Sequence, residues 1–311
     1  MRIVVEVGTH ARWSAMLLEE RGHEVIVCNL RKLPEIYNNP KKSDFVDAET
    51  LARIGHTDSS KLTKLVDYTK RDVVSLGLVR ARDCLVKSRG RLVNHVRGVV
   101  KNVGGRIPCA EGRRFHRFRD DIPVVLRPVL GPLMDAIEMA NTQIRVYDKA
   151  IEARLKHCYP DDGPRLQQIR GVGPTTALYF LAVIGDPERF SSGTKLGGYL
   201  GFGQKRHQSG EKDPHLGITR AGSPLLRALL VGTARTFMDK RAPDSALREW
   251  ALKRIDGVSR IQKNRIVIGL ARKLGVLMLH LLKTKQDFKP YPRGGRPAEP
   301  ELEFVRVQLS A

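Results

Sequence analysis

The stretch RIVVEVGTHARWSAMLLEERGHEVIVC, residues 2–28, decides the fold at the start of this chain. After Arg2, its first residues are apolar except for one acid, Glu6, and predict a short buried strand. A helical pattern over residues 10–21 ends at Gly22, and the apolar run EVIVC predicts a second strand. Strand, helix and strand in this order favour a right-handed crossover with parallel strands. We therefore predict an α/β domain over residues 1–72.

Two aspartates follow in KKSDFVDAE, residues 41–49. Asp44 and Asp47 are three residues apart, so they share a face of the helix predicted from about Ser43 to Ile54, with Ser43 as N-cap. Oxygen ligands suit hard divalent cations, which activate water or a hydroxyl for phosphoryl transfer. Together with Glu6, the pair predicts a metal site. The simpler alternative is a helix start, where acids are favoured in any case.

The charge of the chain indicates a polyanionic partner. Its 311 residues contain 55 Lys and Arg against 33 Asp and Glu, a net charge of +22. Residues 80–119 hold 12 cations and 2 acids, and residues 253–285 hold 9 and 1. Such an excess favours DNA or RNA, with an affinity that falls steeply with salt.

The cysteine content and the hydropathy limit where in the cell the protein is expected to act. Four cysteines without CxxC pairing indicate neither a zinc site nor a disulfide framework, and are typical of a reduced, cytoplasmic protein. No apolar run is long enough for a membrane span, and the N-terminus is not typical of a secretion signal, so we expect no membrane partner.

Residues 73–104 carry a heptad pattern. Val79, Val86, Val93 and Val100 recur every seven residues, which predicts a long helix in a coiled-coil hairpin or a dimer. A second helix over 124–157 completes a stalk, with a basic loop over 106–122 and a linker over 158–164. The candidate nucleic-acid-binding cations of the stalk are Arg80, Arg82, Lys87, Arg89, Arg91, Arg97 and Lys101. A solvated face is the alternative, although such a face usually mixes both signs.

The last third, residues 161–286, is predicted to be mainly helical, with helices over 223–238 and 260–283 and an extended tail over 287–311. Gly171 and Gly173 lie in a turn similar to a helix-hairpin-helix turn, where backbone amides meet phosphate; a merely tight turn is equally compatible. Lys205 and Arg206 are further candidate nucleic-acid-binding residues. Ser209 follows them in QSGEKD, residues 208–213, and sequence alone names no group that would activate it.

Several motifs together resemble one family over nearly the whole chain. They are VEVGTH at 5–10, KSDFVDAE at 42–49, LVNHVRGVVK at 92–101, RGVGP at 170–174, QSGEKD at 208–213 and GITRAG at 217–222. The family is the DEDD-type transposases of bacterial insertion sequences, the Piv/IS110 group. The resemblance implies a RuvC/RNase H-like domain, a coiled-coil insertion and a C-terminal transposase domain.

The same resemblance implies the chemistry. Glu6, Asp44 and Asp47 match three of four acids that bind a divalent metal, Mg²⁺ above all, and Ser209 matches a serine that attacks DNA. A structured non-coding guide RNA pairs with DNA in this family, and a homo-oligomer, a dimer or tetramer, is expected, in the bacterial cytoplasm at the nucleoid. Gln208 stands where many relatives carry a second serine.

The family's first acid lies on a strand before Glu6, and this chain begins immediately before the Glu6 strand. Either this start lies too late, or the chain is a truncated copy; in both cases we expect residues 1–72 to form an N-terminally truncated RNase H-like sheet without that acid. Three functions stay open. The first is an active transposase or site-specific recombinase. The second is a truncated relative that only binds DNA or RNA, and the third is a metal-dependent nuclease of the Holliday-junction resolvase type, in which Ser209 has no role.

Overall fold

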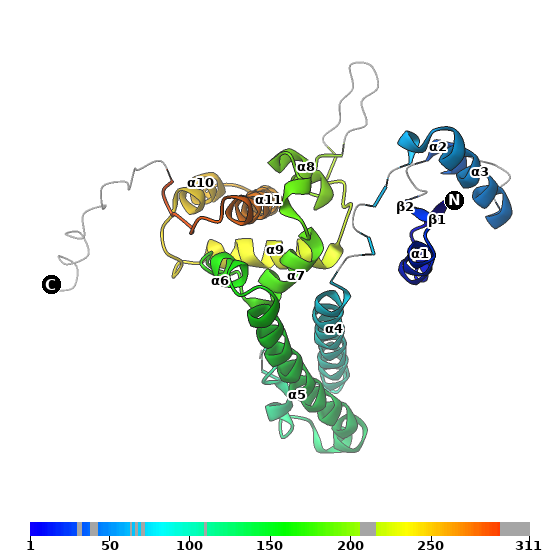
Figure 1. The fold of residues 1–311 in the computed structure, drawn as a ribbon. Helices are drawn as coiled ribbons and strands as arrows, with labels where there is room; N and C mark the ends of the chain where they lie inside the picture. The colour runs from blue at the N-terminus through cyan, green and yellow to red at the C-terminus, as the bar shows by residue number, and fades with distance from the viewer. Residues whose placement is uncertain are drawn as a thin grey trace. The chain divides into compact units, whose positions relative to one another are not determined.

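The computed structural model describes residues 1–29, 33–37, 43–62, 64–65, 68–69, 72–108, 111–205 and 216–292. They form two compact units, Met1–Asp72 and Val73–Ala311, which are treated separately below (Figure 1). The first combines strands with helices, and the described part of the second is helical apart from one isolated bridge. The predicted α/β plus α fold class is confirmed at this level. Among the described residues, no helix is long and apolar enough to cross a membrane.

The N-terminal unit is built on the predicted β-α-β segment. Strand β1 (Arg2–Glu6) pairs in parallel with β2 (Glu24–Cys28), and α1 (Ala11–Glu20) connects them. Successive residues of β2 face opposite sides, so Val27 packs with Ala11 and Ala15 of α1 while Ile26 and Cys28 face the other core.

Helix α3 (Asp44–Thr57) closes that other core. It follows the short α2 (Pro34–Tyr37) and precedes a 3₁₀ turn, η2 (Ser59–Lys61). The Ser43 hydroxyl accepts a hydrogen bond from the Val46 amide, which confirms the predicted N-cap. Gly55 lets α3 approach β1 closely, because a Cβ there would lie 2.4 Å from Val4 Cγ2.

The stalk consists of two long helices, α4 (Val73–Asn102) and α5 (Arg127–Cys158), which lie side by side (Figure 1). The start of α4 packs near the end of α5, and its end packs near the start of α5, so the pair is antiparallel. The heptad residues Val79, Val93 and Val100 are buried. The pattern is therefore satisfied by a hairpin within one chain.

The connection between the two stalk helices is more ordered than the basic loop that the sequence predicts. It contains two 3₁₀ turns, η3 (Phe115–Phe118) and η4 (Val124–Leu126). Phe115 and Ile122 are buried against the stalk helices at this end. The segment is rich in charged residues, so its composition suggested a loop. Its two buried apolar residues, Phe115 and Ile122, nevertheless fix it against the stalk helices.

Residues Thr176 to Ala182 of α7 (Pro174–Ile184) are all buried, and the neighbouring helices pack against either α7 or α11 (Arg260–Thr284). The other elements are α6 (Asp162–Gln167), η5 (Pro187–Arg189), α8 (Gly193–Tyr199), α9 (Pro224–Phe237) and α10 (Ala246–Ile255). The helices predicted over 223–238 and 260–283 are confirmed. The linker predicted over 158–164 is wrong, since α5 continues to Cys158 and α6 begins at Asp162.

Residues 287–292 lie against the helices rather than extending freely. Gln168 binds both the Asp287 carboxylate, at 2.9 Å, and the Phe288 amide, at 2.7 Å. The Tyr291 hydroxyl lies 2.6 Å from a Glu249 carboxylate oxygen. The first part of the predicted tail is thereby bound to α10 and to Gln168, the residue that follows α6, and the rest of the tail lies outside the described residues.

Candidate active site and nucleic-acid interface

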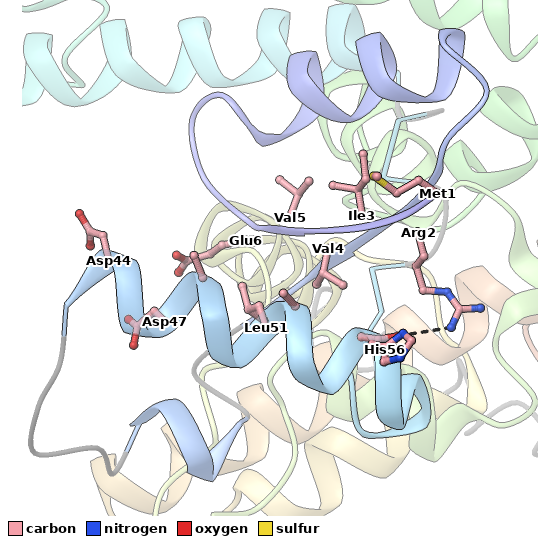
Figure 2. A pocket seen from close by; sticks show the side chains of 13 residues that line it. Met1, Arg2, Ile3, Val4, Val5, Glu6, Asp44, Asp47, Leu51 and His56 are labelled. Atoms are coloured by element: carbon pink, nitrogen blue, oxygen red, sulfur yellow. Dashed lines mark hydrogen bonds between the residues drawn. The ribbon is translucent and has the colours of Figure 1, made fainter.

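The three predicted metal ligands line one pocket of the N-terminal unit. The pocket has a volume of about 740 Å³ and lies between β1 and α3. Glu6 ends β1, while Asp44 and Asp47 occupy the first turn of α3, so all three carboxylates lie toward the same end of the pocket (Figure 2). Arg2 and His56 line the opposite end. The spacing of Asp44 and Asp47 on α3 and the position of Glu6 at the end of β1 therefore bring the three predicted carboxylates to one pocket.

The carboxylates differ in their surroundings. Glu6 and Asp44 are exposed, whereas Asp47 is half-buried, and its Oδ1 is buried without a hydrogen-bond partner. A buried carboxylate oxygen of this kind is costly unless it binds a cation or a donor. However, no three His, Cys, Asp or Glu side chains in the described ranges lie close enough together to hold a metal ion. The chemistry of the donors fits Mg²⁺, and their arrangement does not form a three-carboxylate cage.

Cys28 lies opposite Glu6 in the sheet register and is fully buried. Burial raises the pKa of its thiol, and the nearby negative charge of Glu6 raises that pKa further. Cys28 is therefore a neutral core residue beside the acidic pocket.

The segment that carries the predicted nucleophile lies outside the described residues, which omit 206–215 and with them Arg206 and Ser209. The residues on either side of this segment pair with each other. The Lys205 amide donates to the Gly217 carbonyl and the Thr219 amide donates to the Gly203 carbonyl, each at 2.8 Å. This antiparallel pairing brings the two ends of the segment together. Lys205 itself is exposed.

Two glycines hold these flanks against each other. Gly201 has φ +75° and Gly222 has φ +69°, a region that favours glycine. A Cβ on Gly201 would lie 2.1 Å from the Ala221 carbonyl oxygen, and one on Gly222 would lie 2.2 Å from that of Tyr199. Only glycine permits this close backbone approach, which explains Gly222 of the GITRAG motif, and Gly201 opposite it, in structural terms.

The predicted phosphate-binding cations of α4 fall into two groups. The first group has partners within the stalk. Arg82 forms an ion pair with Asp148 at 2.5 Å, and Arg89 donates to the buried Asn141 side chain at 2.7 Å. Burial lowers the pKa of Arg89, and the like charges of Arg82 and Arg113 lower it further. These two arginines hold the stalk helices together as well as contributing charge.

Arg97 belongs to the same group, since its guanidinium carbon lies 5.1 Å from the centre of the Phe115 ring. Arg80 is exposed but reaches the Tyr179 hydroxyl at 3.4 Å, and Lys87 pairs with Asp83 one helical turn away. Arg91 and Lys101 are exposed and form the second group, whose side chains are open to a partner.

Gly171 and Gly173, the two glycines predicted to contact phosphate, have different roles in the turn between α6 and α7. Gly171 has φ +88°, and a Cβ there would lie 3.0 Å from the Thr233 carbonyl oxygen. Its own carbonyl accepts a hydrogen bond from the Thr233 hydroxyl at 3.1 Å. Gly171 is thus explained by packing against α9. Gly173 is the N-cap of α7, and the space beside it is open, so phosphate contact stays a prediction there.

A basic pocket lies between α9 and α11 and was not predicted from the sequence. Arg227 and Arg235 are eight residues apart on α9, which is two turns of one helix face, and Arg220 joins them from the preceding segment. The spacing of Arg227 and Arg235 on one helix could be seen in the sequence. The contribution of α11 to the same pocket could not, because it depends on how the two helices pack.

Comparison with known proteins agrees with this distribution of features. A family described as Transposase, of the DEDD type of IS110 elements, matches residues 1–104, which include the acidic pocket. The Transposase IS116/IS110/IS902 family matches residues 163–248, which include Ser209 and all three arginines of the basic pocket. Two separate family matches place the chain among the transposases of insertion sequences.

Curated relatives have the same description. The transposase for insertion sequence element IS1111A of Coxiella burnetii is 29% identical over 262 residues, 81% of this chain and 70% of the relative. The transposase for element IS1328 of Yersinia enterocolitica is 26% identical over 279 residues, 88% and 80% respectively. A putative transposase of Sinorhizobium fredii is 40% identical over 228 residues, 71% and 54%. The chain belongs to the DEDD-type IS110 family of transposases.

Proposed function

We propose that this protein cleaves and rejoins DNA with the carboxylates of the acidic pocket and with Ser209 as the nucleophile. The observation that carries the proposal is the gathering of Glu6, Asp44 and Asp47 around one pocket, with a buried Asp47 oxygen that has no hydrogen-bond partner. Transposases act on DNA, so a phosphodiester is the expected substrate of such a site.

A divalent cation, Mg²⁺ in the first instance, completes the proposal. Mg²⁺ usually uses one or two protein carboxylates together with water and substrate phosphate oxygens, so a three-carboxylate cage is not required. Asp47 and Glu6 would hold the ion, with Asp44 beside them. Such an ion, when bound, lowers the pKa of a hydroxyl and neutralises charge on the phosphate.

The chain's own residues have distinct tasks in this scheme. The Ser43 cap fixes the first turn of α3, and with it the position of both aspartates. Gly55 allows β1 and α3 to pack closely enough for Glu6 to share the pocket. The Ser209 hydroxyl would form a bond to the scissile phosphorus as the strand's leaving oxygen departs, and would give its proton to water or to a carboxylate.

The partners follow from the same residues. The exposed Arg91 and Lys101 and the net charge of +22 support contact with a nucleic-acid backbone. We include a structured guide RNA, a RuvC-like character of the first domain and a homo-oligomer in the proposal. The separate stalk and C-terminal domains, 73–160 and 161–286, are proposed as functional divisions of the second unit.

A second candidate is nucleic-acid binding without strand cleavage. The exposed cations of α4 favour it, since they need no catalytic residue in order to act. The two functions differ in what Ser209 contributes.

The test is a recombination assay with the protein, the ends of its element, the flanking non-coding RNA and Mg²⁺. Ser209→Ala should abolish strand transfer and trap no covalent protein–DNA product, while DNA affinity stays at the wild-type value. The matched control is Ser192→Ala, which removes the hydroxyl of the N-cap of α8, outside the proposed site, and should leave strand transfer intact. Unchanged recombination by Ser209→Ala would remove the serine from the mechanism.

A further inference from the structure

The groove between α9 and α11 contains a pocket of about 440 Å³ with an unusual lining. Arginines Arg220, Arg227 and Arg235 line it, while Val231, Val267 and Ile268 add apolar surface. None of its described lining residues is acidic. An apolar surface beside several convergent polar groups is the usual form of a ligand site.

The backbone explains why these side chains converge. Arg227, Val231 and Arg235 recur every four residues on α9, so they share one face. Asn264 and Ile268 have the same spacing on the facing helix α11. One face of α9 therefore forms one wall of the pocket, and one face of α11 forms the other.

The third arginine reaches the pocket through a rare backbone conformation. Arg220 has φ +56°, although it is not glycine, and its amide donates to the Gly201 carbonyl at 3.1 Å. Left-handed non-glycine residues are uncommon, and they gather at binding and catalytic sites because the surrounding structure must hold them there. The close backbone approach at Gly201 and Gly222 supplies that support.

Among the residues that the structure describes, no carboxylate neutralises the positive charge of the pocket. In the described part of the chain, no acidic side chain forms an ion pair with Arg220, Arg227 or Arg235. Arg227 is held by the backbone carbonyls of Leu200 and Ala221 instead. Burial lowers the pKa of Arg227, and the neighbouring charge of Arg220 lowers it further, so an anion here would relieve a repulsion.

We infer that this pocket binds one backbone phosphate of a DNA strand. Arginine forks match the oxygens of a phosphate, which explains why three of them meet in one groove. The pocket lies at the base of residues 206–215, because Arg220 follows the segment 217–219 that pairs with 203–205. A phosphate bound there would lie beside the paired residues that flank the segment carrying Ser209, and in this respect the inference rests on the proposed function.

The lining favours DNA over RNA. Apolar surface from Val231, Val267 and Ile268 suits a deoxyribose, which has no 2′-hydroxyl in need of a hydrogen-bond partner. Asn264 is the uncharged polar side chain among the described lining residues.

The test measures the affinity of the full chain for a labelled DNA duplex by fluorescence anisotropy across a salt series. The double variant Arg220→Gln/Arg235→Gln removes both exposed arginines and leaves Arg227, which holds the backbone. One lost phosphate contact lowers the salt slope by about 0.9, so the ratio of wild-type to variant affinity should shrink about 3.5-fold between roughly 50 and 200 mM salt. Arg241→Gln, an exposed arginine outside the pocket, should keep the wild-type slope.

Asn264→Asp provides an independent variant, because it adds a negative charge to the pocket at an exposed position. It should weaken DNA binding without changing the melting temperature. A wild-type slope in the double variant and wild-type affinity in Asn264→Asp would overturn the inference, as would a loss confined to an RNA duplex of the same sequence. Because this assay requires no cleavage, Ser209→Ala serves as a further control and should bind as the wild type does. Failure of the serine mechanism would therefore leave the phosphate site standing, and failure of the site would leave the serine mechanism standing.

Discussion

Gly55→Ala tests whether the acidic pocket depends on close packing of α3 against β1. Gly55 lies inside a helix, and its φ is not positive, so alanine would normally stabilise it by about 0.5–1 kcal/mol. Here the added Cβ would lie 2.4 Å from Val4 Cγ2. Val4 is β-branched and packs in the core, so it cannot easily turn away, and such overpacking costs about 1–3 kcal/mol. The clash outweighs the helix preference, and we expect a net loss of about 0.5–2 kcal/mol.

Hydrogen exchange followed by mass spectrometry measures this loss within the N-terminal unit. The β1 amides should exchange roughly 2- to 30-fold faster in Gly55→Ala. Gly98→Ala is the control, since Gly98 also lies in a helix but has open space around it, and there alanine should slow exchange slightly. Adding Val4→Ala to Gly55→Ala should restore part of the protection. Exchange in Gly55→Ala that is as slow as in the wild type would refute the packing argument.

Three further outcomes are expected. Asp47→Asn should abolish Mg²⁺-dependent strand transfer, whereas Glu49→Gln, exposed on the same helix, should not; equal activity of the two would exclude Asp47 from the site. Arg89→Ala should lower the stability of the stalk by about 1–3 kcal/mol in thermal unfolding, because it leaves a buried amide oxygen unpaired, while Arg91→Ala should change it by less than about 0.5 kcal/mol. The raised pKa of Cys28 means that the unfolded chain releases its thiol proton first as pH rises, so the wild type should lose stability above about pH 9 and Cys28→Ala should lose less.

The parts of the fold that could be predicted from the sequence are those specified by short, local sequence patterns. The apolar runs around Glu6 and Cys28 specify strands, Ser43 specifies a helix start, and the valine heptads specify the long helix, because each signal depends on residues near one another in the chain. The spacing of Asp44 and Asp47 and the strand end at Glu6 likewise predicted a shared pocket, and the structure places all three at one.

The roles of the stalk arginines could not be read in the same way. Arg82 finds its partner 66 residues away and Arg89 finds its partner 52 residues away. The heptad pattern shows that these side chains lie outside the apolar face of α4. It does not show which residue of α5 each of them contacts. The same limit hid the basic pocket, whose walls come from two helices separated by α10.

The pairing of residues 203–205 with 217–219 has a consequence for how this family can vary. Because the chain leaves and re-enters the helical core at neighbouring positions, the intervening segment, residues 206–216, can be exchanged as a unit. Substitutions, or even changes of length, within it need not propagate into α8 or α9, since Gly201 and Gly222 fix the attachment points. Reactivity can therefore diverge between elements while the scaffold is inherited unchanged, and a segment transplanted from a relative should be accepted without redesign of the core.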